Sequence, residues 1–231
     1  MKTIGILGGM SWTSTAEYYK QINQGVQKKL GGVHSAKIVL HSVDFEEIKE
    51  TQAAGRWAEA AAILGAAGKG LKNAGADFLV LATNTMHKVA DEIEAASGLP
   101  LLHLADASGE AIRSQGWRTV GLLGTRFTMS EDFYRGRLLQ KFGIKVVVPE
   151  KDEQQVVNSI IYDELCRDCF QDASAWACQL IIEKLIAQGA EAVLLACTEL
   201  PLLIKQSEIK VPLLDTVKLH AEEAVRRALQ E

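Results

Sequence analysis

The sequence lacks a cluster of basic residues and lacks any apolar run long enough to cross a bilayer. Its 25 lysines and arginines are scattered along the chain, and the formal net charge is −4. Proteins that bind nucleic acid or an anionic membrane surface typically carry a basic patch, so we expect neither kind of partner. The longest apolar runs are the length of a strand, so no membrane-spanning helix is expected.

Cysteine is also scarce, and no Gly/Ser-rich or charged linker divides the chain. The first residues, MKTIGILGGM, lack the long apolar core and the small-residue cleavage site of a signal peptide. We therefore expect a cytoplasmic protein whose four cysteines are mostly reduced. With 231 residues, of which 48% are hydrophobic, the chain can bury a core without disulfides.

Short apolar segments alternate with longer amphipathic ones. The expected strands are TIGILG, AKIVLHSV, DFLVLA, LLHLA, TVGLLG, IKVVVP, EAVLLA and VPLLD. Helical periodicity covers residues 11–30, 56–73, 126–142 and 173–188. Strands separated by helices are typical of parallel sheets with both faces covered, so the sequence predicts an α/β fold.

The chain also repeats itself. VGLLGTRFTMSEDFY from Val120 matches IGILGGMSWTSTAEYY from Ile4. GADFLVLATNTMH from Gly75 matches GAEAVLLACTELP from Gly189, and LPLLH is followed in the same way by VPLLD. Three matches in the same order predict two similar α/β halves, each a mainly parallel sheet flanked by helices.

The opening GILGG invites comparison with a dinucleotide-binding fingerprint. Its glycines are Gly5, Gly8 and Gly9, which do not form G-x-G-x-x-G, and no acidic residue ends a second strand at the usual distance of about 20 residues. A strand-to-helix turn whose glycines let a small ligand approach the backbone is favoured over a nucleotide site.

The segment CRDC places Cys166 and Cys169 at the spacing of a redox or zinc half-site. It lies in a helical pattern over residues 153–169, and no second Cys/His pair at ligand spacing accompanies it. We therefore expect these cysteines to pack on a helix and not to bind a metal.

Polar residues follow two of the expected strands, in the matched motifs ATNT and ACTE. Ligands of parallel α/β sheets bind at the carboxyl ends of strands, and amides at a helix start favour an anion such as a carboxylate. Thr85 and Thr198 would add hydroxyl groups, and Asn84 an amide. The alternative is that these residues only cap helices, which accounts for one polar residue at each site.

Cys197 stands in the second motif where Thr83 stands in the first. A helix start lowers the pKa of a thiol, so we expect Cys197 to form a thiolate that acts as nucleophile or base. A nucleophile would need a histidine partner, and His87, His103 and His220 stand at no recognised motif distance. His87 is expected to be structural, with a supporting role at most.

Two matched polar sites on two similar halves favour a ligand contacted from opposite sides. Chemistry that uses both faces of one carbon is racemisation or epimerisation, with a proton removed on one side and returned on the other. No cofactor motif competes with this reading, although spacing alone leaves a lysine that holds pyridoxal phosphate open.

GGMSWTST from Gly8, TNTMH from Thr83 and ACTELPLL from Ala196 resemble the motifs of the aspartate/glutamate racemase family, closest to its aspartate racemase branch. The resemblance implies two similar domains related by a pseudo-twofold axis, with the active site in the cleft between them and no cofactor. It implies residues 1–98 with 210–231 as one domain and 99–209 as the other. Cys197 takes the place of the catalytic cysteine of the second half. The substrate-binding residues would be Met10, Ser11, Gln52 (from the loop after the second strand), Asn84, Thr85, Thr198 and Glu199.

The chain departs from the family pattern at Thr83, where the family usually has a second cysteine. A threonine hydroxyl is a far weaker acid than a thiol, so it would relay a proton only if His87 or a water replenished it. By family analogy the second-half cysteine deprotonates the L enantiomer, which predicts a preference for L substrates. The family's aspartate racemases attract a dicarboxylate with basic residues, whereas the comparable regions here offer Glu46, Glu47 and Glu164.

The leading hypothesis is a cofactor-independent racemase of L-aspartate or L-glutamate, with a broader range of amino acids left open. Cys197 would be the base and Thr83 its atypical partner. Two alternatives remain: a binding protein for a small carboxylate, and another isomerase acting on an unsaturated diacid or a cyclic amide. The sequence does not fix the oligomeric state, for which a homodimer is the commonest form.

Overall fold

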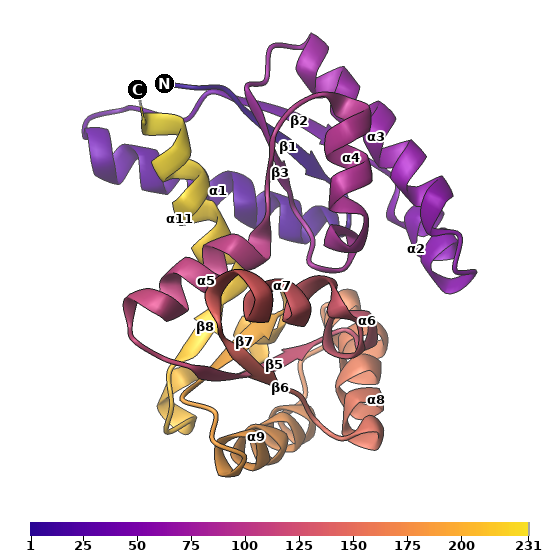
Figure 1. Ribbon diagram of the computed structural model, residues 1–231, viewed down its shortest axis with the longest axis vertical. Coiled ribbons are helices and arrows are strands. Elements are labelled where there is room, and N and C mark those ends of the chain that lie inside the picture. The colour runs from indigo at the N-terminus through magenta and orange to yellow at the C-terminus, as the bar shows by residue number, and fades with distance from the viewer. Residues whose placement is uncertain (231) are drawn as a thin grey trace. The chain divides into compact units, whose positions relative to one another are not determined.

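Eight parallel strands in two sheets form the framework of the computed structural model, which describes residues 1–230 (Figure 1). The first sheet has the order β2-β1-β3-β4, and the second has the order β6-β5-β7-β8. The strands are β1 (Ile4–Gly8), β2 (Ile38–Ser42), β3 (Phe78–Leu81), β4 (Leu101–Leu102), β5 (Thr119–Gly124), β6 (Lys145–Val147), β7 (Ala192–Ala196) and β8 (Leu213–Asp215). The expected strands and the α/β fold class are confirmed, and the shared strand order confirms two similar halves.

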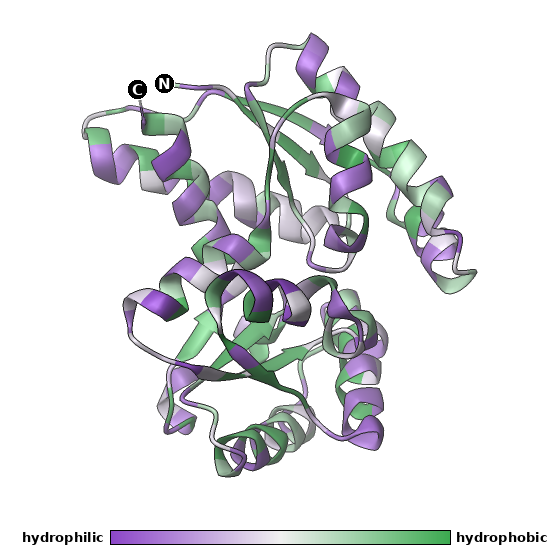
Figure 2. Ribbon diagram, in the orientation of Figure 1, coloured by the Kyte–Doolittle hydropathy of each residue, from purple (hydrophilic) through white to green (hydrophobic). Residues whose placement is uncertain are grey.

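The central strands are the most deeply buried elements of each half. Every residue of β1, β3 and β7 is buried, whereas the edge strand β2 is partly exposed. Figure 2 shows the strands mainly in green, the colour of hydrophobic residues, and the helices with purple and green alternating. Strands covered on both faces need apolar side chains on both, which is why these segments are near-continuous apolar runs.

The helices of the first half follow the expected periodicity. Helix α1 (Trp12–Leu30) begins after its cap residue Ser11 and buries Tyr18, Ile22 and Val26, which are spaced by four residues on one face. The other helices are α2 (Phe45–Ala53), α3 (Trp57–Asn73), the 3-10 helix η1 (Thr85–Val89) and α4 (Ala90–Ser97). The patterns over residues 11–30 and 56–73 are confirmed by α1 and α3.

The second half contains two helices where the sequence predicts one over residues 126–142. The extended backbone of Glu131 separates α6 (Arg126–Ser130) from α7 (Asp132–Phe142). The pattern over residues 173–188 is confirmed by α9 (Asp172–Ala187). The remaining elements are α5 (Leu104–Ser114), α8 (Lys151–Ser159), the π-helix η2 (Ile160–Glu164), η3 (Leu165–Arg167), α10 (Leu200–Leu203), η4 (Gln206–Glu208) and α11 (Thr216–Leu229). Within residues 1–230, no helix is both long enough and apolar enough to span a membrane.

The helical pattern over residues 153–169 is interrupted, which alters the environment of the CRDC segment. Regular α-helix ends at Ser159, and the chain continues through η2 and η3 to Asp168, whose φ of 59° is left-handed. Cys166 and Cys169 are exposed, and neither forms a disulfide. The expectation that both pack on a helix is therefore wrong, because the irregular turns carry their side chains to the surface.

The chain crosses twice between two compact units. One consists of Met1–Leu104 together with the chain from His220 onward, and the other is Ala105–Leu219. These crossings lie several residues beyond the boundaries expected after residues 98 and 209, because β4 joins the first sheet and β8 the second. Such short apolar strands read alike in the sequence whichever sheet they join.

Because of these crossings, each unit contains a helix that follows a strand of the other sheet. Helix α5 follows β4, and its Ser108 hydroxyl hydrogen-bonds the Tyr134 hydroxyl of α7 at 2.8 Å. Helix α11 follows β8, and Nδ1 of its His220 hydrogen-bonds the Tyr18 hydroxyl of α1 at 2.9 Å. Tyr18 and Tyr134 are matched residues of the repeat, so the two contacts are equivalent.

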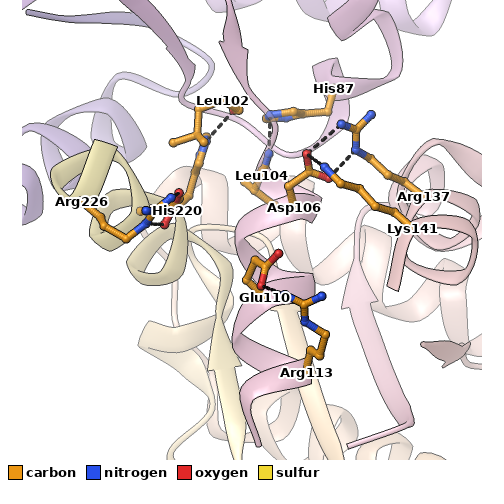
Figure 3. A network of polar contacts seen from close by, with 11 residues as sticks. His87, Leu102, Leu104, Asp106, Glu110, Arg113, Arg137, Lys141, His220 and Arg226 are labelled. Carbon is orange, nitrogen blue, oxygen red and sulfur yellow. Dashed lines mark hydrogen bonds and ion pairs between the residues drawn. The ribbon is translucent and has the colours of Figure 1, made fainter. Parts of the chain in front are cut away.

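An ionic cluster adds to the contact between α5 and α7. Asp106 accepts hydrogen bonds from Nε and Nη2 of Arg137 at 2.6 and 2.8 Å and from Nζ of Lys141 at 2.7 Å (Figure 3). Burial raises the pKa of the Asp106 carboxyl, but the bonds and charges of Arg137 and Lys141 outweigh it and lower the pKa overall. The carboxylate is therefore a structural anchor between two helices of the second unit.

Candidate functional site

In the turn from β1 into α1, the backbone of Gly8 and Gly9 comes so close to neighbouring residues that a side chain would not fit. A Cβ at Gly8 would lie 2.3 Å from Cγ2 of Thr15, and the amide of Gly9 donates to Oγ1 of Thr15 at 2.8 Å. Ser11 caps α1, its hydroxyl accepting from the amide of Ser14 at 3.3 Å. Met10 is buried in the core of the first unit. The turn expected from the glycines is present, with Ser11 and Met10 anchoring its far end.

The polar trio after β3 is buried. Thr83 is 9% exposed, and Asn84 and Thr85 are each 5% exposed. Thr85 begins the 3-10 helix η1, and Asn84 precedes it without a capping hydrogen bond from its side chain. The reading of Asn84 as only a helix cap therefore has no support in this geometry.

Gln52 lies near this trio, but not in a loop. It belongs to α2 and is buried, and its Nε2 donates to Sδ of Met86, in η1, at 2.9 Å. The expected position in the loop after the second strand is wrong, because the chain turns helical at Phe45, immediately after its cap residue Asp44.

His87 contacts the backbone of Thr83 and not its hydroxyl. Nδ1 of His87 hydrogen-bonds the carbonyl oxygen of Thr83 at 2.8 Å, and Nε2 accepts from the amide of Leu104 at 3.1 Å. The ring proton on Nδ1 is directed at the Thr83 carbonyl, and Nε2 is occupied by an amide, so the imidazole has no proton directed at the Thr83 hydroxyl. The relay through His87 considered from the sequence is therefore wrong.

In the second unit, Cys197 follows directly on β7 and faces an acidic side chain. The thiol is 7% exposed, and it donates to Oε2 of Glu199 at 3.0 Å. The Thr198 hydroxyl donates to the same oxygen. Glu199 is itself buried, and its Oε2 accepts the hydrogen bonds of both neighbours. These three residues form the Cys197–Glu199 cluster.

The environment of Cys197 favours the protonated thiol. Burial raises the pKa of Cys197 well above its ordinary value, and the negative charge of Glu199 raises it further. The expectation of a pKa lowered by a helix start is wrong, because α10 spans only Leu200–Leu203 and its dipole is too short to offset desolvation. The thiol therefore needs a base before it can remove a proton.

Two further residues belong with this cluster. Tyr162, on η2, packs against the same core as Cys197. Burial raises the pKa of Tyr162 to about 12, neighbouring groups that include Cys197 and Glu199 add to the rise, and Arg126 opposes it. The repeat aligns Arg126 with Met10, an expected substrate-binding residue, so the sequence could have identified Arg126 as a candidate for the site. Tyr162 has no such signal, because a π-helical turn leaves no periodicity in the sequence.

The part of the chain that the structure describes contains no group of side chains arranged as metal ligands. Among residues 1–230, no set of three or more His, Cys, Asp and Glu side chains is arranged to hold a metal ion. The three clustered histidines His87, His103 and His220 are no exception, since His87 and His220 use both ring nitrogens for protein hydrogen bonds.

Comparison with known proteins gives consistent matches over the whole chain. Residues 7–224 match the family model described as Asp/Glu/Hydantoin racemase. A candidate Asp/Glu racemase from Yersinia pestis is 52% identical, with a TM-score of 0.94 and full coverage of both chains. An aspartate racemase homologue from Pyrococcus horikoshii OT3 is 35% identical, with a TM-score of 0.85 and full coverage of both chains. The broad-specificity amino-acid racemase RacX of Bacillus subtilis (strain 168) is 28% identical over 96% of each chain. The chain belongs to the Asp/Glu/hydantoin racemase family.

Proposed function

We propose that the protein is an amino-acid racemase that works without a cofactor and prefers L-aspartate or L-glutamate. The family supports the reaction class, and the names of the relatives support the substrate class. The observation that carries the proposal is the buried thiol of Cys197 in hydrogen-bond contact with a buried carboxylate at the carboxyl end of β7. A thiol and a carboxylate that can accept its proton thus lie at the end of the sheet where ligands of α/β proteins bind.

In this mechanism Glu199 takes the thiol proton, and the thiolate of Cys197 then removes the Cα proton of the L enantiomer. The α-ammonium group of the substrate brings a positive charge that stabilises the thiolate, which offsets the cost of burial. Asn84, Thr85 and Thr198 hold the α-carboxylate. The resulting carbanion receives a proton from either side: return from Cys197 regenerates the L form, and delivery on the Thr83 side gives the D form.

Thr83 makes proton removal unequal on the two faces of the substrate. Its hydroxyl cannot serve as a resting base near neutral pH, because its pKa lies far above that of a thiol. Removal of the Cα proton from a D substrate is therefore slow, whereas donation to a carbanion is less demanding. The Cα proton of an L substrate should therefore exchange with solvent faster than that of a D substrate.

Solvent exchange tests the proposal directly. L-aspartate and L-glutamate incubated with the protein in D₂O should gain deuterium at Cα, and Cys197→Ala should abolish the gain. Cys169→Ser is the matched control, since this cysteine is exposed and remote from the cluster in the sequence, and it should retain full exchange. Exchange that is absent with every amino acid tried, or equal in Cys197→Ala, would overturn the mechanism.

A second candidate is a binding protein for a small carboxylate. It is favoured by Thr83 in the place of a cysteine and by the raised pKa of Cys197, both of which weaken catalysis. Such a protein would show a higher melting temperature with the amino acid but no exchange at Cα. The broad specificity in the name of RacX supports extending the panel to other amino acids, and an unsaturated diacid and a cyclic amide test the other isomerase reactions.

A further inference from the structure

The hydrogen bonds of His87 fix its tautomer. A main-chain amide can only donate, so Nε2, which faces the amide of Leu104 at 3.1 Å, is the unprotonated nitrogen (Figure 3). A carbonyl can only accept, so Nδ1 carries the proton that bonds the oxygen of Thr83 at 2.8 Å. One neutral imidazole thus joins Thr83 to Leu104, the residue after which the chain passes from the first unit to the second.

Two other histidines hold the same region. Nε2 of His220 donates to the carbonyl of Leu102 at 2.8 Å (Figure 3), which leaves Nδ1 to accept from the hydroxyl of Tyr18. The ring centroid of His87 lies 4.7 Å from that of His103 and 5.7 Å from that of His220. Burial lowers the pKa of His87 well below its ordinary value, and His103 and His220 lower it further. His87 and His220 are therefore neutral, and each is hydrogen-bonded in one defined way.

The second half folds the same way without these histidines. The repeat aligns His87 with Pro201 and His103 with Asp215, and the same register places Ser108 opposite His220. Both halves nevertheless form the same sheet order. The same sheet order therefore forms in the second half without histidines at these positions, and the histidines occur in the half that has threonine where the other half has the cysteine.

We propose that His87 is a positioning residue that fixes the Thr83 segment by holding the carbonyl of Thr83 and the amide of Leu104 on opposite nitrogens of one ring. This inference rests on the proposed function, in which the Thr83 side delivers a proton to the carbanion. A threonine is a poor acid, so donation depends strongly on the placement of its hydroxyl. Loosening the segment should impair delivery on this face and leave proton removal by Cys197 intact.

Three substitutions separate the two hydrogen bonds. His87→Asn places an amide near the Nδ1 position and keeps the bond to Thr83. His87→Gln reaches the Nε2 position and keeps the bond to Leu104. His87→Leu removes both, and His41→Gln, at an exposed histidine of β2, is the matched control.

The kinetic readout is the ratio of D product formed to deuterium gained by the remaining L-aspartate. We expect this ratio to fall about tenfold in His87→Leu and His87→Gln, to stay within about threefold in His87→Asn, and to be unchanged in His41→Gln. A proportional fall of product and exchange in all three His87 variants, or an unchanged ratio in His87→Leu, would overturn the positioning role.

A second readout does not depend on activity. In a Thr83→Cys/Cys197→Ala background, the rate at which iodoacetamide labels residue 83 reports its placement, resolved by mass spectrometry. Adding His87→Gln or His87→Leu should change this rate severalfold, and adding His87→Asn should not. Equal rates in all three would overturn the inference, whereas wild-type protein that exchanges no amino acid would overturn the proposed function, whatever the labelling rates.

Discussion

The thiol of Cys197 and the carboxylate of Glu199 form a buried hydrogen bond, with 3.0 Å between Sγ and Oε2. The two residues are separated by Thr198 alone, so the backbone of a single turn sets this geometry. A thiol paired with a carboxylate stays protonated until that carboxylate accepts its proton. This pairing should affect both the acidity of the thiol and the rate of proton transfer, and each can be measured.

Glu199→Gln should separate the acidity of the thiol from the catalytic rate. Removing the negative charge should lower the pKa of Cys197, because Glu199 contributes to its rise. Iodoacetamide should therefore label Cys197 faster near neutral pH. Exchange at Cα of L-aspartate should nevertheless fall by roughly 10²–10⁴-fold, the range for loss of a proton-transfer group. Exchange that rose together with the labelling rate would show that Glu199 does not accept the proton.

Thr83→Cys should add a competent base on the side where this chain has a hydroxyl. A thiol is ordinarily far more acidic than a hydroxyl, and the α-ammonium group of the bound substrate favours its thiolate as it does that of Cys197. We expect exchange at Cα of D-aspartate in D₂O to rise at least about tenfold, with a smaller change for L-aspartate. Thr83→Ser keeps a hydroxyl and is the matched control. A D-aspartate rate equal in both variants would contradict the asymmetric pair.

Acid should destabilise the first unit through His220. Burial is the largest influence on this imidazole and lowers its pKa from 6.5 to about 4, although Leu102 and Glu223 act in the opposite direction. The unfolded chain binds the proton first as pH falls. The contribution of the neutral His220 imidazole to the free energy of unfolding is therefore complete above about pH 6.5. Between there and about pH 4 this contribution falls by roughly 3 kcal/mol.

His220→Gln removes this titration and keeps a donor for the carbonyl of Leu102. Urea unfolding at several pH values between 7 and 4.5 should show a shallower decline of the unfolding free energy than in wild type. Asp106 does not obscure the comparison, because its lowered pKa affects stability only in more acidic solution. Parallel pH profiles for the two proteins would refute the assignment.

Gly109→Ala should destabilise the contact between α5 and α7. The added Cβ would lie 2.4 Å from Cδ2 of Phe142, which is too close without a shift of the ring. We expect a loss of about 1–3 kcal/mol in urea unfolding. Gly136→Ala is the control, since its Cβ would meet Asp132 at 3.4 Å and alanine suits a helix better than glycine.

A compensating substitution makes this prediction sharper. Phe142→Leu removes the ring that the new methyl group meets, so the double variant should be more stable than the sum of the single effects implies. A double-mutant cycle measures this coupling, which should exceed about 1 kcal/mol. Strictly additive effects would show that the loss at Gly109 arises elsewhere.

The framework of the fold could be predicted because its signals are local and repeated. Apolar runs such as FLVLA and AVLLA identify buried strands, and the repeat pairs Thr83 with Cys197 without structural information. The break at Glu131 and the π-helical turn carrying Tyr162 could not be predicted, because neither changes the spacing of apolar residues enough to be read. Helix patterns identify faces and not the turns between them.

The direction of the Cys197 pKa shift depends on quantities that a sequence does not contain. Its place after a strand indicated a helix start, but the length of α10 and the depth of burial decide which influence is larger. His87 is a similar case. Its spacing from Thr83 indicated proximity, whereas the direction of its two nitrogens assigns it to the backbone instead of the hydroxyl.

The exchange of α5 and α11 has a consequence for biosynthesis. The second unit is a single continuous stretch, Ala105–Leu219, so the ribosome supplies all of it before the first unit is whole. The first unit still lacks α11, whose His220 bonds Tyr18 and Leu102, until translation passes that helix. Nascent multidomain chains generally fold from the N-terminus onward. Here the unit whose synthesis begins first should complete its folding last, because Tyr18 and β4 lack their contacts with His220 until α11 has been made.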